Sequence, residues 1–244
     1  MTGSKALFTT PRSRIAFAVD ASSTAEATPL LDLLAPHVSI DKIGLELFTR
    51  EGPRAVSWAR ERGLDVFLDL KLHDIPETVE RAIAAISAMG VRYATIHAQG
   101  GPAMLERAAR RAETEGGTFT LLAVTVLTSL DAADLAAVGV AGSPADQVLR
   151  LASLAFRSGV GGIVSSAAEA AALRAALGDD ALLVTPGIRL PGTAAGDQKR
   201  VMGPGDARRA GADVLVVGRP LRDAVDPVRA ARAIADDLAA AGDA

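Results

Sequence analysis

The sequence predicts a (β/α)8 barrel, or TIM barrel, that comprises the whole chain as a single domain. Eight short runs rich in Val, Ile and Leu recur along the 244 residues, and stretches with helical spacing of apolar residues lie between them. Strands that alternate with helices in this way form βαβ units and a parallel sheet. Dividing 244 residues among eight units gives about 30 residues a unit, which matches the smaller barrels of roughly 250 residues.

The expected strands are almost continuous in apolar residues. A strand with one face in water alternates apolar and polar side chains, whereas short continuous runs are typical of strands buried on both faces. In chain order the expected strands are Ile15–Val19, Ser39–Leu45, Asp65–Leu70, Tyr93–His97, Phe119–Leu127, Gly162–Val164, Leu182–Thr185 and Val214–Gly218.

The expected helices are rich in Ala, Leu, Glu and Arg. In chain order they are Thr24–Leu34, Pro53–Arg62, Glu77–Met89, Pro102–Thr114, Pro144–Arg157, Ala167–Leu177 and Val228–Ala240. The alternative fold is a doubly wound open sheet, which would carry Gly-x-Gly-x-x-Gly after its first strand if it bound a dinucleotide. The chain has Asp20-Ala21-Ser22-Ser23-Thr24 there instead. We expect residues 1–13 and 240–244 to be frayed tails.

The composition excludes several kinds of site and partner. The chain has no cysteine, which excludes disulfides, zinc–thiolate sites, iron–sulfur clusters and thiol catalysis. Its net charge of -3 argues against a general nucleic-acid-binding protein, which is normally basic. The N-terminus, Met1 to Arg14, has no apolar stretch of the length that a signal peptide requires, and no segment of the chain has the apolar length of a membrane span. We therefore expect a cytoplasmic protein with no nucleic-acid or membrane partner.

Charged residues gather at the ends of the first three expected strands. Only four of the 26 cationic residues are lysines, and two of these, Lys42 and Lys71, fall in or just after these strands. Asp69 stands two residues before Lys71, so strand geometry predicts that both side chains point to the same side. Asp20 closes the first strand, and Asp74 follows the third. Barrels of this class carry their chemistry at these strand ends.

Structural interpretations of the same residues are available. Asp69 and Lys71 could form a stabilising ion pair, and Asp74 could cap a helix with Glu77 completing a capping box. Thr128, after the fifth strand, could bind a polar ligand or belong to the cap of a short helix. Buried charges rarely add net stability, whereas functional sites tolerate their cost. The cluster therefore favours a functional site, and without a His-x-x-His or similar grouping it gives no reason to expect a transition metal.

The last two units predict a phosphate site. Pro186-Gly187-Ile188-Arg189 follows the seventh strand, and Gly218-Arg219 follows the eighth. Loops at these two positions commonly bind phosphate in this fold, and arginine presents a rigid fork of donors to a dianion. The Gly- and Pro-rich loop from Leu190 to Gln198 is expected to act as a lid. The alternative is that the glycines only permit tight turns and the arginines are solvated.

Taken together, residues from about Arg14 to Arg232 resemble the orotidine 5′-phosphate decarboxylase family in its bacterial form. The most specific segment is Asp69-Leu70-Lys71-Leu72-His73-Asp74-Ile75-Pro76-Glu77-Thr78, which matches the family's Asp-x-Lys-x-x-Asp signature and its Ile-Pro-x-Thr extension. The other matching segments, in order, are Asp20, Lys42-Ile43-Gly44, Leu127-Thr128-Ser129, Thr185-Pro186-Gly187-Ile188-Arg189, Asp197-Gln198 and Val217-Gly218-Arg219.

The resemblance implies removal of CO2 from orotidine 5′-monophosphate (OMP) to give uridine 5′-monophosphate (UMP) in de novo pyrimidine biosynthesis, without cofactor or metal. It implies a homodimer in which Asp74 and Thr78 reach into the neighbouring subunit's site. Lys71 is implied as the proton donor to C6, and Asp69 as the group beside the departing carboxylate. Asp20, Lys42, Asp74 and Thr78 are implied to hold the ribose hydroxyls and to complete the charge array, so that Lys42 and Asp74 are implied catalytic residues together with Lys71 and Asp69. The other implied substrate-binding residues are Thr128 at the pyrimidine, and Pro186, Arg189, Gln198, Gly218 and Arg219 at the phosphate or the lid.

Two other functions are compatible with part of this pattern. A magnesium-dependent 3-keto-gulonate 6-phosphate decarboxylase or hexulose 6-phosphate synthase shares the Asp-x-Lys-x-x-Asp signature, but the loop from Pro186 to Gln198 argues against it. A non-catalytic barrel that binds a nucleotide is the second alternative. The intact Lys71 and both neighbouring aspartates argue against that function.

Overall fold

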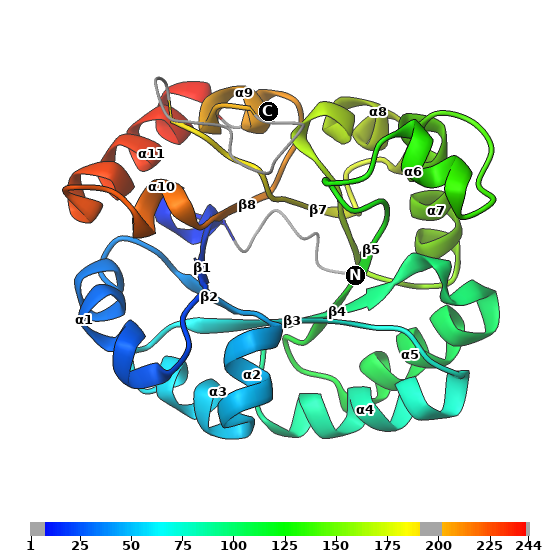
Figure 1. Ribbon diagram of the computed structural model, residues 1–244, viewed down its shortest axis with the longest axis horizontal. Helices are drawn as coiled ribbons and strands as arrows, with labels where there is room; N and C mark the ends of the chain where they lie inside the picture. Colours follow the sequence, from blue (N-terminus) through cyan, green and yellow to red (C-terminus); the bar gives the residue numbers. More distant parts are fainter. Residues whose placement is uncertain (1–7, 191–201, 243–244) are drawn as a thin grey trace.

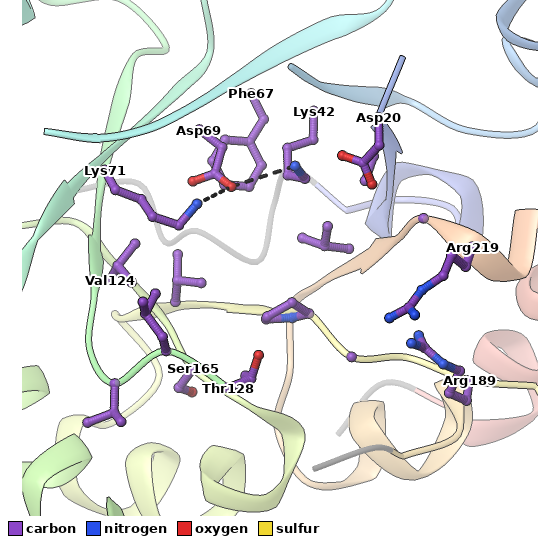
Figure 2. Close-up of a pocket in the computed structure, with 18 residues that line it drawn as sticks. Asp20, Lys42, Phe67, Asp69, Lys71, Val124, Thr128, Ser165, Arg189 and Arg219 are labelled. Atoms are coloured by element: carbon purple, nitrogen blue, oxygen red, sulfur yellow. Dashed lines mark hydrogen bonds and ion pairs between the residues drawn. The ribbon is translucent and has the colours of Figure 1, made fainter. Parts of the chain in front are cut away.

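Eight parallel strands close into a barrel in sequence order, with the helices outside (Figure 1). The computed structural model describes residues 8–190 and 202–242, and it confirms the predicted fold class. The carboxyl ends of the strands surround the pocket drawn in Figure 2. The strands are β1 (Ile15–Val19), β2 (Ile40–Ile43), β3 (Asp65–Leu72), β4 (Tyr93–His97), β5 (Thr120–Val124), β6 (Gly162–Val164), β7 (Leu182–Thr185) and β8 (Val214–Val217).

The helices cover the outside of the barrel. They are α1 (Thr24–Leu34), α2 (Leu45–Glu51), α3 (Pro53–Arg60), α4 (Pro76–Ala88), α5 (Gly101–Glu115), α6 (Ala132–Ala137), α7 (Pro144–Arg157), α8 (Ala167–Leu177), α9 (Pro204–Arg209), α10 (Arg219–Arg222) and α11 (Pro227–Ala241), with 3-10 turns η2 (Pro11–Arg14) and η3 (Ala98–Gly100). The bounds of α1, α7 and α8 agree with the expected ones. Among the described residues, no helix has both the length and the apolar character needed to cross a membrane.

Local sequence signals explain where the long helices begin. Ser23 accepts a hydrogen bond from the backbone of Glu26 at the start of α1, and Ser143 accepts one from Asp146 at the start of α7. Such caps satisfy backbone N–H groups that have no partner inside the helix. Helices α3, α4, α5, α7 and α11 carry proline in their first turn, where the missing N–H costs nothing.

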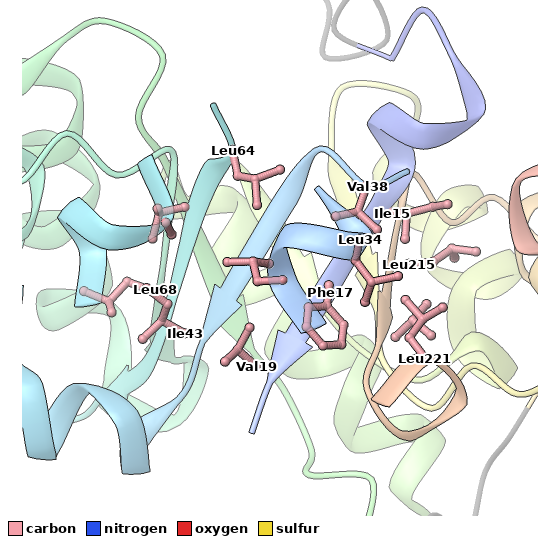
Figure 3. Close-up of a cluster of buried hydrophobic side chains, with 14 of the residues drawn as sticks. Ile15, Phe17, Val19, Leu34, Val38, Ile43, Leu64, Leu68, Leu215 and Leu221 are labelled. Carbon is pink, nitrogen blue, oxygen red and sulfur yellow. The ribbon is translucent and has the colours of Figure 1, made fainter. Parts of the chain in front are cut away.

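Strands β1, β2, β7 and β8 are buried along their whole length, as predicted, whereas β3 is only partly buried from Asp69 to Leu72. In β1, Ala16 and Ala18 face the barrel interior, where they pack with Phe67 and other strand residues. Phe17 and its outward neighbours pack against the helix layer. Figure 3 shows this outer cluster between the strands and the surrounding helices.

The amino-terminal end of the barrel is closed by part of the expected frayed tail. Phe8 is buried and belongs to the interior cluster, and the Arg14 guanidinium lies 5.0 Å from the centre of its ring. The expectation that residues 1–13 fray is therefore wrong from Phe8 onward, because this side chain fills the floor of the barrel. At the carboxyl end of the chain, the expectation that residues 240–244 fray is wrong for Ala240 and Ala241, because helix α11 continues to Ala241. Residues 1–7 and 243–244 lie outside the described residues.

Asp213 anchors the amino-terminal ends of the last two strands. Its carboxylate lies 2.6 Å from an Arg174 nitrogen and 3.9 Å from an Arg208 nitrogen, and it accepts a hydrogen bond of 2.9 Å from the backbone N–H of Leu183. Asp213 and Arg208 are buried. A buried charge is tolerated when it is paired and hydrogen-bonded. This network joins α8 and α9 to the strands at the end of the barrel away from the pocket. In this fold, residues at that end contribute to stability rather than to catalysis.

Asp41 is a second buried carboxyl group, but in the described part of the chain it lacks the hydrogen bonds that hold Asp213. It lies in β2, and among the described residues neither of its carboxylate oxygens has a hydrogen-bond partner. Burial raises the pKa of Asp41 to about 8, although the charges of Lys42 and Arg62 act in the opposite direction. The side chain therefore keeps its proton in the folded protein at neutral pH and loses it in the unfolded chain.

We expect the stability of the protein to fall as pH rises from about 4 to 8. In that window the folded state binds one more proton at Asp41 than the unfolded state does, so raising the pH favours unfolding. The variant Asp41→Asn cannot titrate and should gain roughly 2–4 kcal/mol over the wild type at pH 8 but little at pH 4. Urea unfolding at both pH values measures this difference. Equal pH dependence in the two proteins would contradict it.

Candidate active site

A pocket of about 290 Å³ opens at the carboxyl ends of the strands (Figure 2). It gathers nine of the twelve predicted site residues from separate parts of the chain. These are Asp20, Lys42, Asp69, Lys71, Thr128, Pro186, Arg189, Gly218 and Arg219. The structure thus places them in one cavity, and their roles stay predictions.

Asp69 is the centre of the charged end of the pocket. One of its oxygens, Oδ2, lies 2.8 Å from Lys71 Nζ and 3.6 Å from Lys42 Nζ. The other oxygen, Oδ1, accepts a hydrogen bond of 3.0 Å from the Thr95 hydroxyl. Only 14% of the Asp69 side chain is exposed. The carboxylate is therefore held from both sides, and two ammonium groups converge on a single oxygen.

The surroundings keep Asp69 ionised. Burial acts to raise its pKa, but the charges of Lys42 and Lys71, together with hydrogen bonds from Lys71 and Thr95, lower it below its ordinary value. The charged form of a carboxylate is favoured when opposite charges and donors surround it. At neutral pH the cluster therefore holds a fixed negative charge between two ammonium groups.

Strand β3 reaches this arrangement through a bulge. Leu68 pairs with Ala94 and Leu72 pairs with Ile96, so three residues of β3 lie opposite one residue of β4. Lys71 has a φ of 52°, and it is the only residue other than glycine with positive φ among the described residues. Regular alternation along a strand predicted that Asp69 and Lys71 share a side. They do meet, but an irregular backbone brings them together.

A backbone of this kind is costly for a residue with a side chain. The left-handed region costs about 1–2 kcal/mol for residues other than glycine, and it persists where the surrounding structure holds it. Here the Lys71 N–H donates a hydrogen bond of 2.8 Å to the Thr95 hydroxyl. Thr95 was not among the predicted site residues, because an isolated threonine in an apolar strand has no distinguishing pattern.

Asp20, directly after β1, and Lys42, in β2, reach the same side of the pocket. A Cβ atom added at Gly44 would lie 3.7 Å from Lys42 Nζ and 4.0 Å from Asp20 Oδ1, so both groups reach the space beside this glycine. Asp20 is also 3.8 Å from Arg222, which bonds more closely to Asp223. Sequence reasoning missed Arg222, because it lies beyond the strand-end motif on α10.

The opposite end of the pocket is cationic. In Figure 2 the guanidinium groups of Arg189 and Arg219 point toward one another, at the end of the pocket opposite Lys71. Ile188 forms a parallel bridge with Met202, and the Arg189 N–H donates to the Met202 carbonyl at 3.0 Å. These bonds hold Arg189 at the mouth. The predicted lid residue Gln198 lies outside the described residues.

An apolar wall joins the two charged ends. Sequence reasoning missed these residues, although the inward alternation of the strands could have found them. They are Ala18, Phe67, Val124, Val126, Val164 and Val216. Two hydroxyls, of Thr128 and Ser165, lie along the same side of the pocket (Figure 2). A flat, partly apolar ring with polar edges fits such a surface.

Asp74 and Thr78 do not line this pocket within one chain; both are exposed. The Asp74 carboxylate accepts a hydrogen bond of 2.6 Å from the Ile75 N–H, and helix α4 begins at Pro76 with Ile75 as its N-cap. The alternative of an Asp74 cap with a capping box is therefore wrong, and Glu77 pairs with Arg81 instead. Helix capping therefore does not explain the presence of an aspartate at position 74.

Among the described residues, no three or more His, Cys, Asp or Glu side chains are grouped so that they could hold a metal ion. The Asp69 carboxylate is paired with the ammonium groups of Lys42 and Lys71.

Comparisons with known proteins agree on one family. A family model described as "Orotidine 5′-phosphate decarboxylase / HUMPS family" matches residues 13–234. The chain is 56% identical to an orotidine 5′-phosphate decarboxylase of Anaeromyxobacter sp. (strain K) over 93% of this chain and 99% of that protein. It is 49% identical to one from Halorhodospira halophila, over 94% of this chain and 97% of that protein. The crystal structure of orotidine 5′-phosphate decarboxylase from Lactobacillus acidophilus superposes with a TM-score of 0.82 at 34% identity, over 93% of this chain and 99% of that one.

Proposed function

The chain belongs to the orotidine 5′-phosphate decarboxylase / HUMPS family, and we propose that the pocket described above is where it decarboxylates OMP to UMP in pyrimidine biosynthesis. The observation that carries this assignment is the Asp69 carboxylate held between two ammonium groups. The arginine pair stands at the other end of the same pocket. A phosphorylated substrate with a second anionic group fits these two ends.

The reaction needs the protein to stabilise a carbanion. When the bond between C6 and the carboxylate breaks, CO2 leaves and the electron pair stays on C6. No electron sink such as pyridoxal phosphate is needed if a cation lies close to C6. Lys71 supplies that cation, and its Nζ then gives a proton to C6 to complete UMP. The resulting neutral amine takes a proton back from water.

Asp69 contributes by its fixed negative charge. Placed about 4 Å from the substrate carboxylate, it would repel that group by about 4 kcal/mol at an effective dielectric of 20. This repulsion is relieved as CO2 departs, and it amounts to about a thousandfold in rate. Repulsion alone therefore supplies only part of the acceleration. Charge stabilisation by Lys71 and binding energy from the phosphate must supply the rest.

The other lining residues have roles in holding the substrate. Asp20 and Lys42, which lie together beside Gly44, would hold the ribose hydroxyls and complete the charge array. The Thr128 hydroxyl would meet the pyrimidine. At the far end, Arg189 and Arg219 would bind the phosphate. Pro186 and Gly218 shape the same end of the pocket, and Gln198 would complete it from the predicted lid.

We also propose a homodimer, in which Asp74 and Thr78 complete the partner's site. Its support is the exposure of both residues and of Ile75, whose apolar side chain is 66% exposed between them. A second chain that covered this turn would remove the Ile75 side chain from water. A solution mass of one chain, 25.0 kDa, at assay concentration would contradict this assembly. The predicted cytoplasmic location stays a prediction.

We expect the purified protein to convert OMP to UMP at full rate in the presence of EDTA, because no step above uses a metal. A spectrophotometric assay that follows the loss of OMP measures this directly. The magnesium-dependent sugar-phosphate enzymes of the same family are the alternative, and they would lose activity in EDTA and act on a different substrate. Binding of UMP without any turnover of OMP would instead indicate a non-catalytic nucleotide-binding barrel.

A further inference from the structure

Thr95 contacts the two most important groups of the charged cluster without lining the pocket. Its side chain is buried, with 1% exposed, and it lies in β4 beneath the bulge of β3. Building on the proposed decarboxylation, we infer that Thr95 is a positioning residue: its hydroxyl holds the Asp69 carboxylate and the Lys71 backbone in the geometry that the reaction uses.

The hydrogen-bond directions leave the hydroxyl no alternative. A threonine hydroxyl has one proton to donate and can also accept. It accepts from the Lys71 N–H at 2.8 Å, and an amide N–H can only donate. Its own proton then goes to Asp69 Oδ1 at 3.0 Å, and an ionised carboxylate can only accept. Both partners thereby fix the orientation of the hydroxyl, and the hydroxyl fixes both partners.

The bulge explains why the Lys71 N–H donates its hydrogen bond to a side chain and not to a backbone carbonyl of β4. Between the pairs Leu68–Ala94 and Leu72–Ile96, β3 has three residues where β4 has only Thr95. The regular ladder therefore cannot satisfy every backbone group of the bulge. The Thr95 hydroxyl takes the place of the missing backbone acceptor for Lys71, the residue with φ of 52°. Without it, a partly buried N–H would lose its partner at the most strained point of the strand.

The same hydroxyl also sets the direction of the Asp69 carboxylate. With Oδ1 bonded to Thr95, Oδ2 is turned toward Lys71 and Lys42. If Oδ1 were free, the carboxylate could rotate and chelate one ammonium group with both oxygens. Such a rotation would draw Lys71 Nζ away from the position in which it faces the pocket. Hydrogen bonds to charged groups are among the stronger ones in proteins, so the loss should be measurable.

The test compares Thr95→Val with Thr95→Ser. Valine keeps the branched shape and removes the hydroxyl, whereas serine keeps the hydroxyl and removes the methyl group. We expect Thr95→Val to lower kcat for OMP by about 10- to 100-fold with less than about threefold change in KM, because substrate-binding groups are untouched. Thr95→Ser should stay within about threefold of the wild-type kcat. A merely structural role would not be rescued by serine and would not confine the loss to kcat.

Thr185→Val is a matched control. Thr185 is equally buried in β7, and its hydroxyl has no hydrogen-bond partner among the described residues. The same substitution there should leave kcat and KM unchanged. If Thr95→Val fails to fold, the pair Thr95→Ser and Thr95→Ala carries the same comparison, with serine expected to exceed alanine about tenfold or more. Both members of that pair lack the methyl group, so only the hydroxyl differs.

Three results would overturn the inference. They are a Thr95→Val enzyme with wild-type kcat, a Thr95→Ser enzyme as impaired as Thr95→Val, and a loss that appears mainly in KM. An inactive wild-type protein would overturn the proposed function itself, and this inference with it. Normal wild-type turnover together with any of the three results above would overturn the Thr95 role alone.

Discussion

The Lys71→Ala variant is expected to lose turnover of OMP by at least about 10⁴-fold while it still binds UMP. In the proposed mechanism the ammonium group has two roles at C6, since it stabilises the developing negative charge and then supplies the proton. General acids contribute about 10²–10⁴-fold, and preorganised charge in a water-poor site contributes at least as much. In the proposed binding mode other residues hold the phosphate and ribose groups of UMP, so its affinity should change little. Rates of OMP loss and calorimetric titration with UMP measure the two effects.

Two further variants of Lys71 separate charge, proton transfer and backbone strain. Lys71→Arg keeps a positive charge, but a guanidinium effectively cannot give up its proton. It should therefore be nearly as inactive as the alanine variant. Lys71→Gly should be inactive too, yet better suited to the backbone with φ of 52°. Near-normal turnover in either Lys71→Ala or Lys71→Arg would contradict the role of Lys71 as the acid.

The sequence predicted the fold well because the signals that define a barrel are local. Continuous apolar runs identified all eight strands, and β1, β4, β6 and β7 have the bounds that were expected. The short helices α2, α9 and α10 were not expected, since four to seven residues carry too little periodicity to be distinguished from a loop. Phe8 was assigned to a frayed tail, because its packing partners come from strands far along the chain.

The charged site was predictable for a related reason. In a parallel barrel the carboxyl ends of all strands surround one mouth. The proximity of Asp20, Lys42 and Asp69 could therefore be predicted from the sequence. The bulge at Lys71 could not be predicted from the sequence, because the motif Asp-x-Lys also fits a regular strand. Only the pairing with β4 reveals it. Thr95 is a functional candidate because of that bulge, which is why sequence reasoning passed over it.

The Arg219→Ala variant is expected to lower kcat/KM for OMP by about 10²–10³-fold. Arg219 follows β8 and stands with Arg189 at the cationic end of the pocket. A bidentate pair with phosphate provides two charge-assisted hydrogen bonds, each contributing about 1.5–3 kcal/mol. In the proposed binding mode the phosphate is far from the bond that breaks, so its binding energy is available to hold the pyrimidine against the Asp69 charge. Steady-state kinetics with OMP measure the loss.

The nucleoside orotidine provides the control for this variant, because it has the reacting ring and lacks the phosphate. If Arg219 acts on the phosphate, Arg219→Ala and the wild type should decarboxylate orotidine at equal, slow rates. Arg219→Lys should recover only part of the activity toward OMP, since an ammonium group cannot reproduce the planar fork of donors. An unchanged kcat/KM for OMP in Arg219→Ala would contradict the phosphate assignment. A parallel loss with orotidine would instead place Arg219 among the groups that shape the reacting end of the pocket.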